Sequence, residues 1–328
     1  MRAIGYSEFG IAGDVLALHD VALPEPAAGE VRVKLVFSGV NPSDAKARGG
    51  TRPGVLKPPF DLVVPHSDGA GVIDAVGAGV DPARIGARVW IWNGQWQRAF
   101  GTAAEAICVP SEQAVALPEG ASLEAGATLG IPGLTAAHTV FGCGDIAGQT
   151  LFISGGAGAV GHNAVQLAKW GGARVIATAS PNAFERVTDA GADHVLEYRA
   201  PDLAAQVLSL TDGKGVDRAV EVEFGANAPL LAEVVCANGT IAAYGSQLDM
   251  APTLPFGSFL FKAITIDIVL IYILDPATRA AAIEKLLAAL SQGALTPEIH
   301  EIMPLEDAAL AHERVVTSGR SGAVLLKI

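Results

Sequence analysis

Hydrophobic and polar positions change their pattern twice along this chain of 328 residues. Up to about residue 120, short apolar and β-branched runs such as VRVKLVF, RVWIW and AEAICVP alternate with segments rich in proline and glycine. Runs of this kind, bounded by turn residues, are typical of β-strands. The first 120 residues therefore predict a β-rich, irregular domain.

From about residue 121 to 255, strand-like runs alternate with segments of helical length. These runs are TLFISGG, AVGHNAVQLAKWG, ARVIATAS, FERVTDAGA, DHVLEY, DLAAQVLSLTDG, VDRAVEV, APLLAEVVCANG and TIAAYGS. Such alternation predicts a doubly wound parallel sheet with helices on both faces. After Pro255 come an aliphatic strand, the helix PATRAAAIEKLLAALSQG and a tail ending in AVLLKI. The predicted fold class is α/β.

A glycine-rich turn in ISGGAGAVGHNAVQLAKWGG (153–172) gives the strongest chemical signal. The strand before it leads into GxGxxG spacing, and helical periodicity begins at once. Such a turn lets the backbone approach a pyrophosphate and points the amides of a helix N-terminus at its charge. The alternative, a plain glycine turn, is disfavoured by the alternating units that follow. The residues expected at the phosphates are Gly156, Gly158, Ala159, Val160 and Gly161.

The type of dinucleotide is indicated by the end of the next strand. An NAD site normally carries an acid about 20 residues past the glycines, yet RVIATASPNAF (174–184) contains none and the first carboxylate is Glu185. This favours NADPH over NAD, because an acid would repel a 2′-phosphate. Candidate hydroxyl and amide donors are Thr178, Ser180 and Asn182, and candidate positive charges are Arg174, Arg186 and Arg199. The alternative is that these are ordinary polar loop residues.

Charge and cysteine content narrow the class of protein. A formal net charge of −12 without a basic run argues against nucleic-acid and membrane-surface partners. Cys108, Cys143 and Cys236 form neither a CxxC pair nor an even disulfide set, which indicates a reducing compartment. The start lacks the apolar run of a signal peptide, and the longest apolar stretch (264–274) is too short for a bilayer and carries Asp267. We expect a soluble, cytoplasmic protein.

The stretch PHSDGAG (65–71) raises the question of a metal site, because His66 stands two residues before Asp68. A catalytic zinc needs three protein ligands of nitrogen, sulfur or oxygen type, with a fourth position open. No cysteine or second histidine accompanies His66 in the sequence. A histidine that packs beside Asp68 or lines a cleft is the favoured interpretation, and no metal is predicted.

Five segments, in order and spacing, resemble the zeta-crystallin-like, zinc-free quinone reductases of the medium-chain dehydrogenase/reductase superfamily. The resemblance covers essentially the whole length. The segments are GVNPSDAKARGG (39–50), VPHSDGAGVIDAVGAGV (64–80), LGIPGLTAAHTVF (129–141), the glycine turn and AHERVVTSGRSGAVLL (311–326).

The resemblance implies a GroES-like catalytic domain formed by residues 1–120 and completed by 256–328. A Rossmann NADP-binding domain at 121–255 would lie between these parts of the chain, with the active site in the cleft. It also implies that the three zinc ligands of the metal-dependent relatives are absent. Their places are taken here by Asn41, Ser67 and Ile131, and His66 stands where those relatives have a glycine.

Without zinc, no Lewis acid polarises an alkoxide, so the acceptor must already be activated. Quinones and α,β-unsaturated carbonyls meet this requirement, because conjugation carries the incoming charge to an oxygen that donors or solvent can stabilise. The predicted activity is hydride transfer from NADPH to a quinone or a similar conjugated carbonyl. The alternatives are an enone or 2-alkenal double-bond reductase, and a non-enzymatic NADPH-binding structural or redox-sensing protein.

The resemblance also suggests acceptor-side residues. Asn41 would contact the nicotinamide and its ribose, with a plain Asn-Pro turn as the alternative. Lys46 replaces a family tyrosine and is either a donor to the acceptor or a solvated surface residue. Trp92 and Trp96, in WIWNGQWQRAF (90–100), would contact a planar acceptor or form a hydrophobic wall of the β domain.

Further cofactor contacts follow from the same resemblance. Thr135 matches a threonine at the nicotinamide end, or is a helix-start hydroxyl. Tyr198 and Arg199 resemble a segment beside the adenosine phosphate, and Phe184 replaces a family lysine, so Arg320 is a further candidate for positive charge. Gly245 and Ser246 match residues that run along the cofactor, or form a plain turn.

The aliphatic run 264–273 predicts the last strand of the Rossmann sheet. An exposed edge strand must be covered. In the relatives this strand pairs with its twin in a second subunit, so the resemblance implies a homodimer. The alternative is burial under the chain's own final helix.

Overall fold

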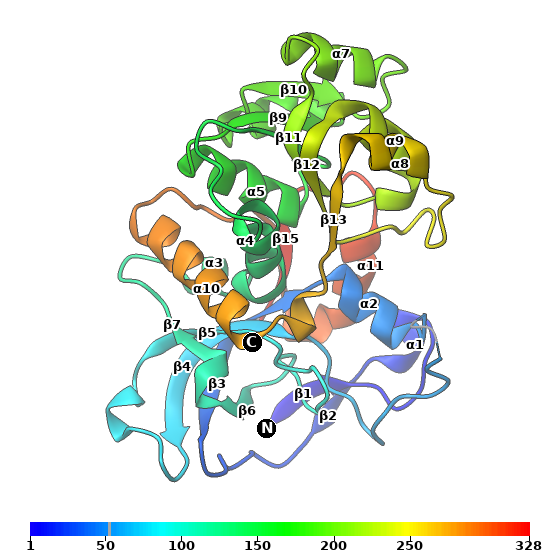
Figure 1. Cartoon of the computed structure of the whole chain (residues 1–328). Coiled ribbons are helices and arrows are strands. Elements are labelled where there is room, and N and C mark those ends of the chain that lie inside the picture. The colour runs from blue at the N-terminus through cyan, green and yellow to red at the C-terminus, as the bar shows by residue number, and fades with distance from the viewer. Residues whose placement is uncertain (52–53) are drawn as a thin grey trace. The chain divides into compact units, whose positions relative to one another are not determined.

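The computed structural model describes residues 1–51 and 54–328. The chain forms two compact units (Figure 1). The first contains Met1–Ile131 and Pro297–Ile328, and the second contains Pro132–Thr296. Both ends of the chain therefore contribute to the first unit, and the second unit is one continuous segment. Among the described residues, no helix has both the length and the apolar character needed to cross a membrane.

The first unit is built on a seven-stranded sheet in which most neighbours are antiparallel. The strand order is β14-β15-β3-β4-β5-β7, and β6 pairs with β3 beside this path. β1 and β2 form a separate antiparallel pair. The strands are β1 (Arg2–Gly5), β2 (Ala17–Asp20), β3 (Glu30–Val40), β4 (Asp68–Val76), β5 (Arg88–Ile91), β6 (Ala106–Pro110), β7 (Ala114–Ala116), β14 (Ile299–Pro304) and β15 (Ala323–Lys327).

Alternation along β3 explains the core of this unit, since Val31, Val33 and Leu35 point to one face and are buried. Against them pack buried aliphatic residues of β4, β5 and β6, among them Ile73 and Ile107. The helices of the unit are short: α1 (Ala12–Val15), α2 (Pro42–Arg48), α3 (Leu123–Gly126) and α11 (Ala308–Val316).

The second unit has a six-stranded sheet in which every neighbouring pair is parallel. The strand order is β10-β9-β8-β11-β12-β13, which is the Rossmann order, and it reverses between β8 and β11. The strands are β8 (Thr150–Ile153), β9 (Arg174–Ala179), β10 (His194–Glu197), β11 (Val216–Glu221), β12 (Val235–Ala243) and β13 (Thr265–Ile268). Their carboxyl ends share one edge of the sheet.

Two groups of helices flank these strands, as Figure 1 shows. The helices α5 and α10 both pack against α4, and α7 and α9 both pack against α8. The helices of the unit are α4 (Leu134–Phe141), α5 (Ala159–Trp170), α6 (Phe184–Asp189), α7 (Leu203–Leu210), α8 (Phe224–Val234), α9 (Phe256–Lys262) and α10 (Pro276–Ser291). The α/β fold class, with a parallel Rossmann sheet and a β-rich GroES-like unit, is confirmed.

The boundaries between the units differ from the predicted ones at residues 120 and 255. β13 continues the Rossmann sheet by parallel pairing with β12, and α10 packs on α4, so residues 256–296 belong to the second unit. The sequence change at Pro255 marks a loop inside this unit. The strand predicted within 264–273 is also shorter, because after Ile268 the chain turns and a short helix forms at Ile271–Ile273.

Candidate functional site

The glycine turn between β8 and α5 has the geometry that the motif predicted. Gly155 has a φ of +67°, and its N–H donates to Thr178 Oγ1 at 3.1 Å. The N–H of Gly156 donates to the Thr178 carbonyl at 2.8 Å. A Cβ on Gly161 would lie 2.1 Å from the carbonyl oxygen of Gly155, so a side chain would prevent the helix from packing on the turn. Gly158 is the N-cap of α5.

The first turn of α5 carries the predicted phosphate contacts Ala159, Val160 and Gly161. The first amides of a helix have no partner inside the helix, and the helix dipole adds positive potential there. The turn lies beside the point where the strand order reverses, which is where open α/β sheets bind ligands. This is a dinucleotide-binding arrangement.

The other predicted cofactor residues of the second unit follow the carboxyl ends of neighbouring strands. Ser180 follows β9, Tyr198 and Arg199 follow β10, and Gly245 and Ser246 follow β12. Glu197 pairs with Ala179 in the sheet, and the N–H of Tyr198 donates to the Ala179 carbonyl at 3.3 Å. The structure thus brings these residues to the same edge as the glycine turn.

The surroundings of Ser180 contain hydroxyl groups and one exposed guanidinium. Ser180 Oγ donates to Asn182 Oδ1 at 2.5 Å, and the Arg199 guanidinium lies over the ring of Tyr198, 4.9 Å from its centroid. One candidate charge is wrong: Arg174 is the first residue of β9, so it lies at the opposite edge of the sheet, about 20 Å from Ser180 at strand rise. It donates there to the Leu210 carbonyl.

In the first unit, Asn41 precedes helix α2 and is buried. Its Nδ2 donates to Asp68 Oδ2 at 2.8 Å, and its backbone N–H donates to Asp44 Oδ2 at 2.8 Å. Burial raises the pKa of Asp68 well above its usual range and the charge of Asp44 adds to this, against the Asn41 hydrogen bond. Both the side chain and the backbone of Asn41 are therefore fixed by acids.

The other residues predicted to contact the acceptor differ in how far their side chains are exposed. Lys46 is exposed on α2, which agrees with either interpretation of it. Trp92 follows β5 and is buried in the core of the unit, which favours the hydrophobic wall over an acceptor contact. Trp96 is partly buried in the turn that follows. The roles of Asn41 and Lys46 stay predictions.

Two predicted cofactor residues are not joined to the edge of the Rossmann sheet. Thr135 is buried on α4, where its carbonyl accepts from Thr139 Oγ1 at 2.8 Å. Arg320 belongs to the first unit, between α11 and β15, and donates to the Gly322 carbonyl. Their assignment to the cofactor stays a prediction.

His66 is fully buried, as a packed histidine should be, but its partner is His312 of α11, 246 positions later in the chain. The two Nε2 atoms are 2.9 Å apart and the rings stack. His66 Nδ1 is 2.8 Å from Ser38 Oγ. The φ of His66 is +78°, a conformation that favours glycine, which is the residue that the resemblance implies for the relatives at this place.

The hydrogen bonds around this pair fix the tautomer of each ring. Thr102 donates its single proton to the Asp68 carbonyl, so Ser38 must donate to Thr102 Oγ1 at 2.8 Å. Ser38 then accepts from His66 Nδ1–H, and His66 Nε2 accepts from His312 Nε2–H. Only one proton can lie between the two Nε2 atoms.

The residues present do not fit a catalytic zinc. The places that the resemblance assigns to the ligands of the metal-dependent relatives hold the Asn41 amide, whose nitrogen donates to Asp68, the buried Ser67 hydroxyl and the hydrocarbon side chain of Ile131. None of these offers the thiolate or imidazole that zinc prefers. Within residues 1–51 and 54–328, no three His, Cys, Asp or Glu side chains are grouped closely enough to hold a metal.

Sequence reasoning missed several buried polar residues. The sequence shows Asp68 only as a neighbour of His66, although its carboxylate fixes the amide of Asn41. Nothing in the sequence around His312 marks it as the partner of His66. Glu221, at the end of β11, carried a usable signal, because an acid at the end of a buried strand at the switch point suggests a role in the site.

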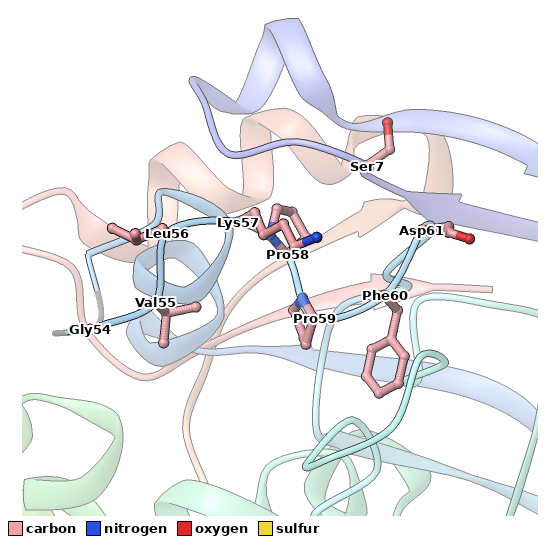
Figure 2. A pocket seen from close by; sticks show the side chains of 9 residues that line it. All are labelled: Ser7, Gly54, Val55, Leu56, Lys57, Pro58, Pro59, Phe60 and Asp61. Atoms are coloured by element: carbon pink, nitrogen blue, oxygen red, sulfur yellow. The ribbon is translucent and has the colours of Figure 1, made fainter.

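A surface pocket of about 490 Å³ lies in the first unit. Figure 2 shows it around the segment that follows Gly54, with Ser7 on the far side and the Phe60 ring turned away from Ser7. Leu56, one of its walls, is 95% exposed. None of the predicted site residues lines this pocket, which consists of Ser7, Gly54, Val55, Leu56, Lys57, Pro58, Pro59, Phe60 and Asp61.

Two family models match the chain. The alcohol dehydrogenase GroES-like domain matches residues 27–119, and the zinc-binding dehydrogenase model matches residues 159–289. The quinone oxidoreductase of Rattus norvegicus is 30% identical over 339 residues, which cover 99% of this chain and 97% of the relative.

Solved structures agree with these matches. An NAD-dependent alcohol dehydrogenase superposes with a TM-score of 0.88 at 29% identity, and a mycobacterial protein complexed with NADPH superposes with a TM-score of 0.85 at 28% identity. Each match covers the whole of both chains. The fold and the glycine turn define a dinucleotide-binding oxidoreductase of the medium-chain type. The chain belongs to the quinone oxidoreductase branch of the medium-chain dehydrogenase/reductase superfamily.

The buried histidine pair predicts acid sensitivity. Burial lowers the pKa of His66 well below its usual range, and the charge of His312 lowers it further. Burial also lowers the pKa of His312 to about 3, and the charge of Arg48 contributes to this shift. A histidine whose folded pKa is depressed binds its proton only on unfolding, so the free energy of unfolding should fall as pH drops from about 6.5 toward 3. Each histidine contributes at most about 1.4 kcal/mol per pH unit.

The variant His66→Gly removes one of these groups and suits the positive φ. Urea unfolding at several pH values should show a smaller slope than the wild type, by up to about 1.4 kcal/mol per pH unit. Asn93→Gly is the matched control, because Asn93 is also buried with a positive φ of 53° but does not titrate. Equal slopes in the wild type and His66→Gly would contradict the prediction.

Proposed function

We propose that this chain is an NADPH-dependent quinone oxidoreductase that works without zinc and reduces a quinone or a similar conjugated carbonyl. One observation carries the proposal. The carboxyl end of β9 lacks an acid, and Ser180, Tyr198 and Arg199 gather there beside the glycine turn. Hydroxyl groups and a guanidinium suit a 2′-phosphate, whereas an acid would suit a ribose 2′-hydroxyl.

The relatives support this choice of cofactor and reaction. The rat relative is a quinone oxidoreductase, and the mycobacterial structure contains NADPH. The residues proposed to hold the dinucleotide are the helix amides of Ala159, Val160 and Gly161 at the pyrophosphate, and Ser180 and Arg199 at the 2′-phosphate. NADPH, when bound, supplies a hydride to the acceptor.

The electron balance of the reaction needs no further reactant. Two electrons and one proton pass to a quinone as hydride, a second proton comes from solvent, and the products are the hydroquinone and NADP⁺. A quinone delocalises the incoming charge onto its oxygen, so the protein has mainly to orient the reactants. The amide of Asn41, the hydroxyl of Ser67 and the hydrocarbon side chain of Ile131 are poor zinc ligands, which supports a reaction without zinc.

A homodimer is also proposed, supported by an exposed apolar surface of the second unit. β13 is the last strand of the sheet among the described residues, and Ile268 on it is 69% exposed. Exposed apolar residues gathered beside an edge strand are typical of interfaces. The exposed residues are Leu248, Met250, Phe256, Leu260, Phe261, Ile268, Leu270 and Ile273.

We place the protein in the cytoplasm as part of the same proposal. The three cysteines of the chain, Cys108, Cys143 and Cys236, are free in the structure. Unpaired thiols persist in reducing compartments, where NADPH is also held in its reduced form. A quinone or enone as the partner molecule agrees with the strongly acidic net charge, since such acceptors are uncharged.

The activity is tested by following NADPH oxidation with 1,4-benzoquinone and with a 2-alkenal, before and after dialysis against a chelator. We expect quinone-dependent oxidation that survives metal removal and exceeds the rate with the alkenal. A higher rate with the alkenal would favour a double-bond reductase. Loss of activity on chelation would overturn the zinc-free mechanism, and binding without turnover would favour a non-enzymatic role.

Selection of NADPH is tested with Arg199→Ala. Removal of a charged hydrogen-bond donor to the 2′-phosphate should lower kcat/KM for NADPH about tenfold or more. The value for NADH should change little, because NADH lacks that phosphate. Arg174→Ala is the matched control at the other end of β9 and should leave the preference unchanged. Equal losses with both nucleotides would contradict the assignment.

The proposed dimer is tested with Ile268→Lys, since a charge at the centre of an apolar interface is costly to bury. Sedimentation velocity should show a dimer for the wild type and a monomer for this variant. Leu56→Lys is the control, because Leu56 is also an exposed aliphatic residue but lies in the first unit. A monomeric wild type would overturn the proposal.

A further inference from the structure

Glu221 is a buried acid at the point where the strand order of the Rossmann sheet reverses. It is the last residue of β11, it is 0% exposed, and its neighbour Val220 pairs with Ile153, the last residue of β8. The glycine turn begins immediately after Ile153. Glu221 therefore lies next to the start of that turn without being part of it.

One oxygen of this carboxylate connects two separate turns. Glu221 Oε1 accepts from Ser154 Oγ at 2.8 Å, which is the residue before Gly155. The same oxygen accepts from the N–H of Glu223 at 2.5 Å and from Asn227 Nδ2 at 3.0 Å. The first bond holds the β8–α5 turn, and the other two hold the segment from β11 into α8.

A second acid extends these connections to the next turn along the edge. The Glu223 carboxylate accepts from the N–H groups of Gln247 and Leu248, at 3.0 and 2.7 Å. Ser246 Oγ accepts from the N–H of Gly225 at 2.8 Å. The turns after β8, β11 and β12, which carry the glycine motif and Gly245, are thus linked through the short segment 221–223.

We infer that Glu221 is a positioning residue that holds the glycine turn in its dinucleotide-binding form through Ser154. The inference rests on the proposed NADPH function. The turn contains three glycines within Gly155–Gly158 and has high conformational freedom when unrestrained. Its amides can only face a pyrophosphate in advance if something outside the turn fixes them, which lowers the entropic cost of binding.

The carboxyl group of Glu221 is balanced within the protein by three donors, which are the Ser154 hydroxyl, the N–H of Glu223 and the amide of Asn227. Burial raises its pKa, against the hydrogen bonds from Glu223, Ser154 and Asn227. Its other oxygen, Oε2, is buried without a hydrogen-bond partner among the described residues.

The inference is tested by fluorescence titration of NADPH and NADH and by steady-state kinetics of three variants. Glu221→Leu removes all three hydrogen bonds, and Ser154→Ala removes only the bond to the glycine turn. Both should raise the Kd for NADPH about tenfold, the effect expected when a bond to a charged group is lost. KM for NADPH should rise and kcat at saturating NADPH should stay near the wild-type value. Glu221→Gln keeps an acceptor oxygen and should restore binding to within about threefold of the wild type.

Asp217→Leu is the matched control. Asp217 lies on the same strand and accepts from the N–H of Thr150 at 2.7 Å, so it links β11 to β8 at the opposite edge. This variant should lose stability but keep its Kd for NADPH. An equal loss of NADPH affinity in this control would show a general effect of sheet stability and would overturn the inference.

The variants also separate this inference from the proposed function. If Glu221→Leu does not fold, Ser154→Ala decides, since its side chain is small and its backbone bond to Val220 at 3.0 Å remains. Unchanged affinity in a folded Ser154→Ala variant would overturn the inference alone. A wild type that binds neither NADPH nor NADH would overturn the proposed function together with it.

Discussion

The second unit depends on how a turn with few side chains is held at the open edge of a parallel sheet. The amides of Gly155 and Gly156 are engaged by Thr178, the first residue in from the end of β9. From the other side, Ser154 is tied to Glu221 on β11. Residues of the two strands that flank β8, Thr178 of β9 and Glu221 of β11, thus hold the turn by hydrogen bonds from both sides.

The interior of the first unit contains many polar groups, and each of them needs a hydrogen-bond partner. The hydrogen bond between Asn41 and Asp68 offsets part of the free-energy cost of burying both groups. Ser38, His66 and His312 are satisfied in the same way by a chain of hydrogen bonds, each with one proton. Because every bond in that chain has one direction, adding a proton to the free Nε2 of His66 forces two N–H groups to face each other, and adding one to Nδ1 of His312 buries a charge. Such networks give a unique arrangement at the cost of tolerance to acid.

Most elements of the fold were predictable because their periodicity is local. The strands β8 to β12 and helix α10 appear where apolar runs and helical segments alternate in the sequence, and the glycine motif placed the phosphate end of the site. The His66–His312 contact was not predictable, because 246 residues separate the partners and nothing local marks either one. The boundary near Pro255 was misplaced since a proline-rich loop resembles a linker, whereas the pairing of β13 with β12 is non-local. Arg174 was misjudged because composition alone does not say which end of a strand a charge occupies.

The distribution of acids along the edge of the sheet gives the proposed dinucleotide a direction. The end of β9 has no carboxylate, so it can receive a phosphorylated ribose, while the end of β11 has two, Glu221 and Glu223. Both of these acids already accept backbone amides, so most of their charge is balanced within the protein. Beside Ser180 and Arg199 a 2′-phosphate meets a hydroxyl that can turn from Asn182 toward it and a guanidinium that lies over the Tyr198 ring. Charges that lie farther from the phosphate than the screening length of about 8 Å have little effect on it. The nearby donors therefore decide the orientation, and a chain that is acidic overall can still bind a polyanion.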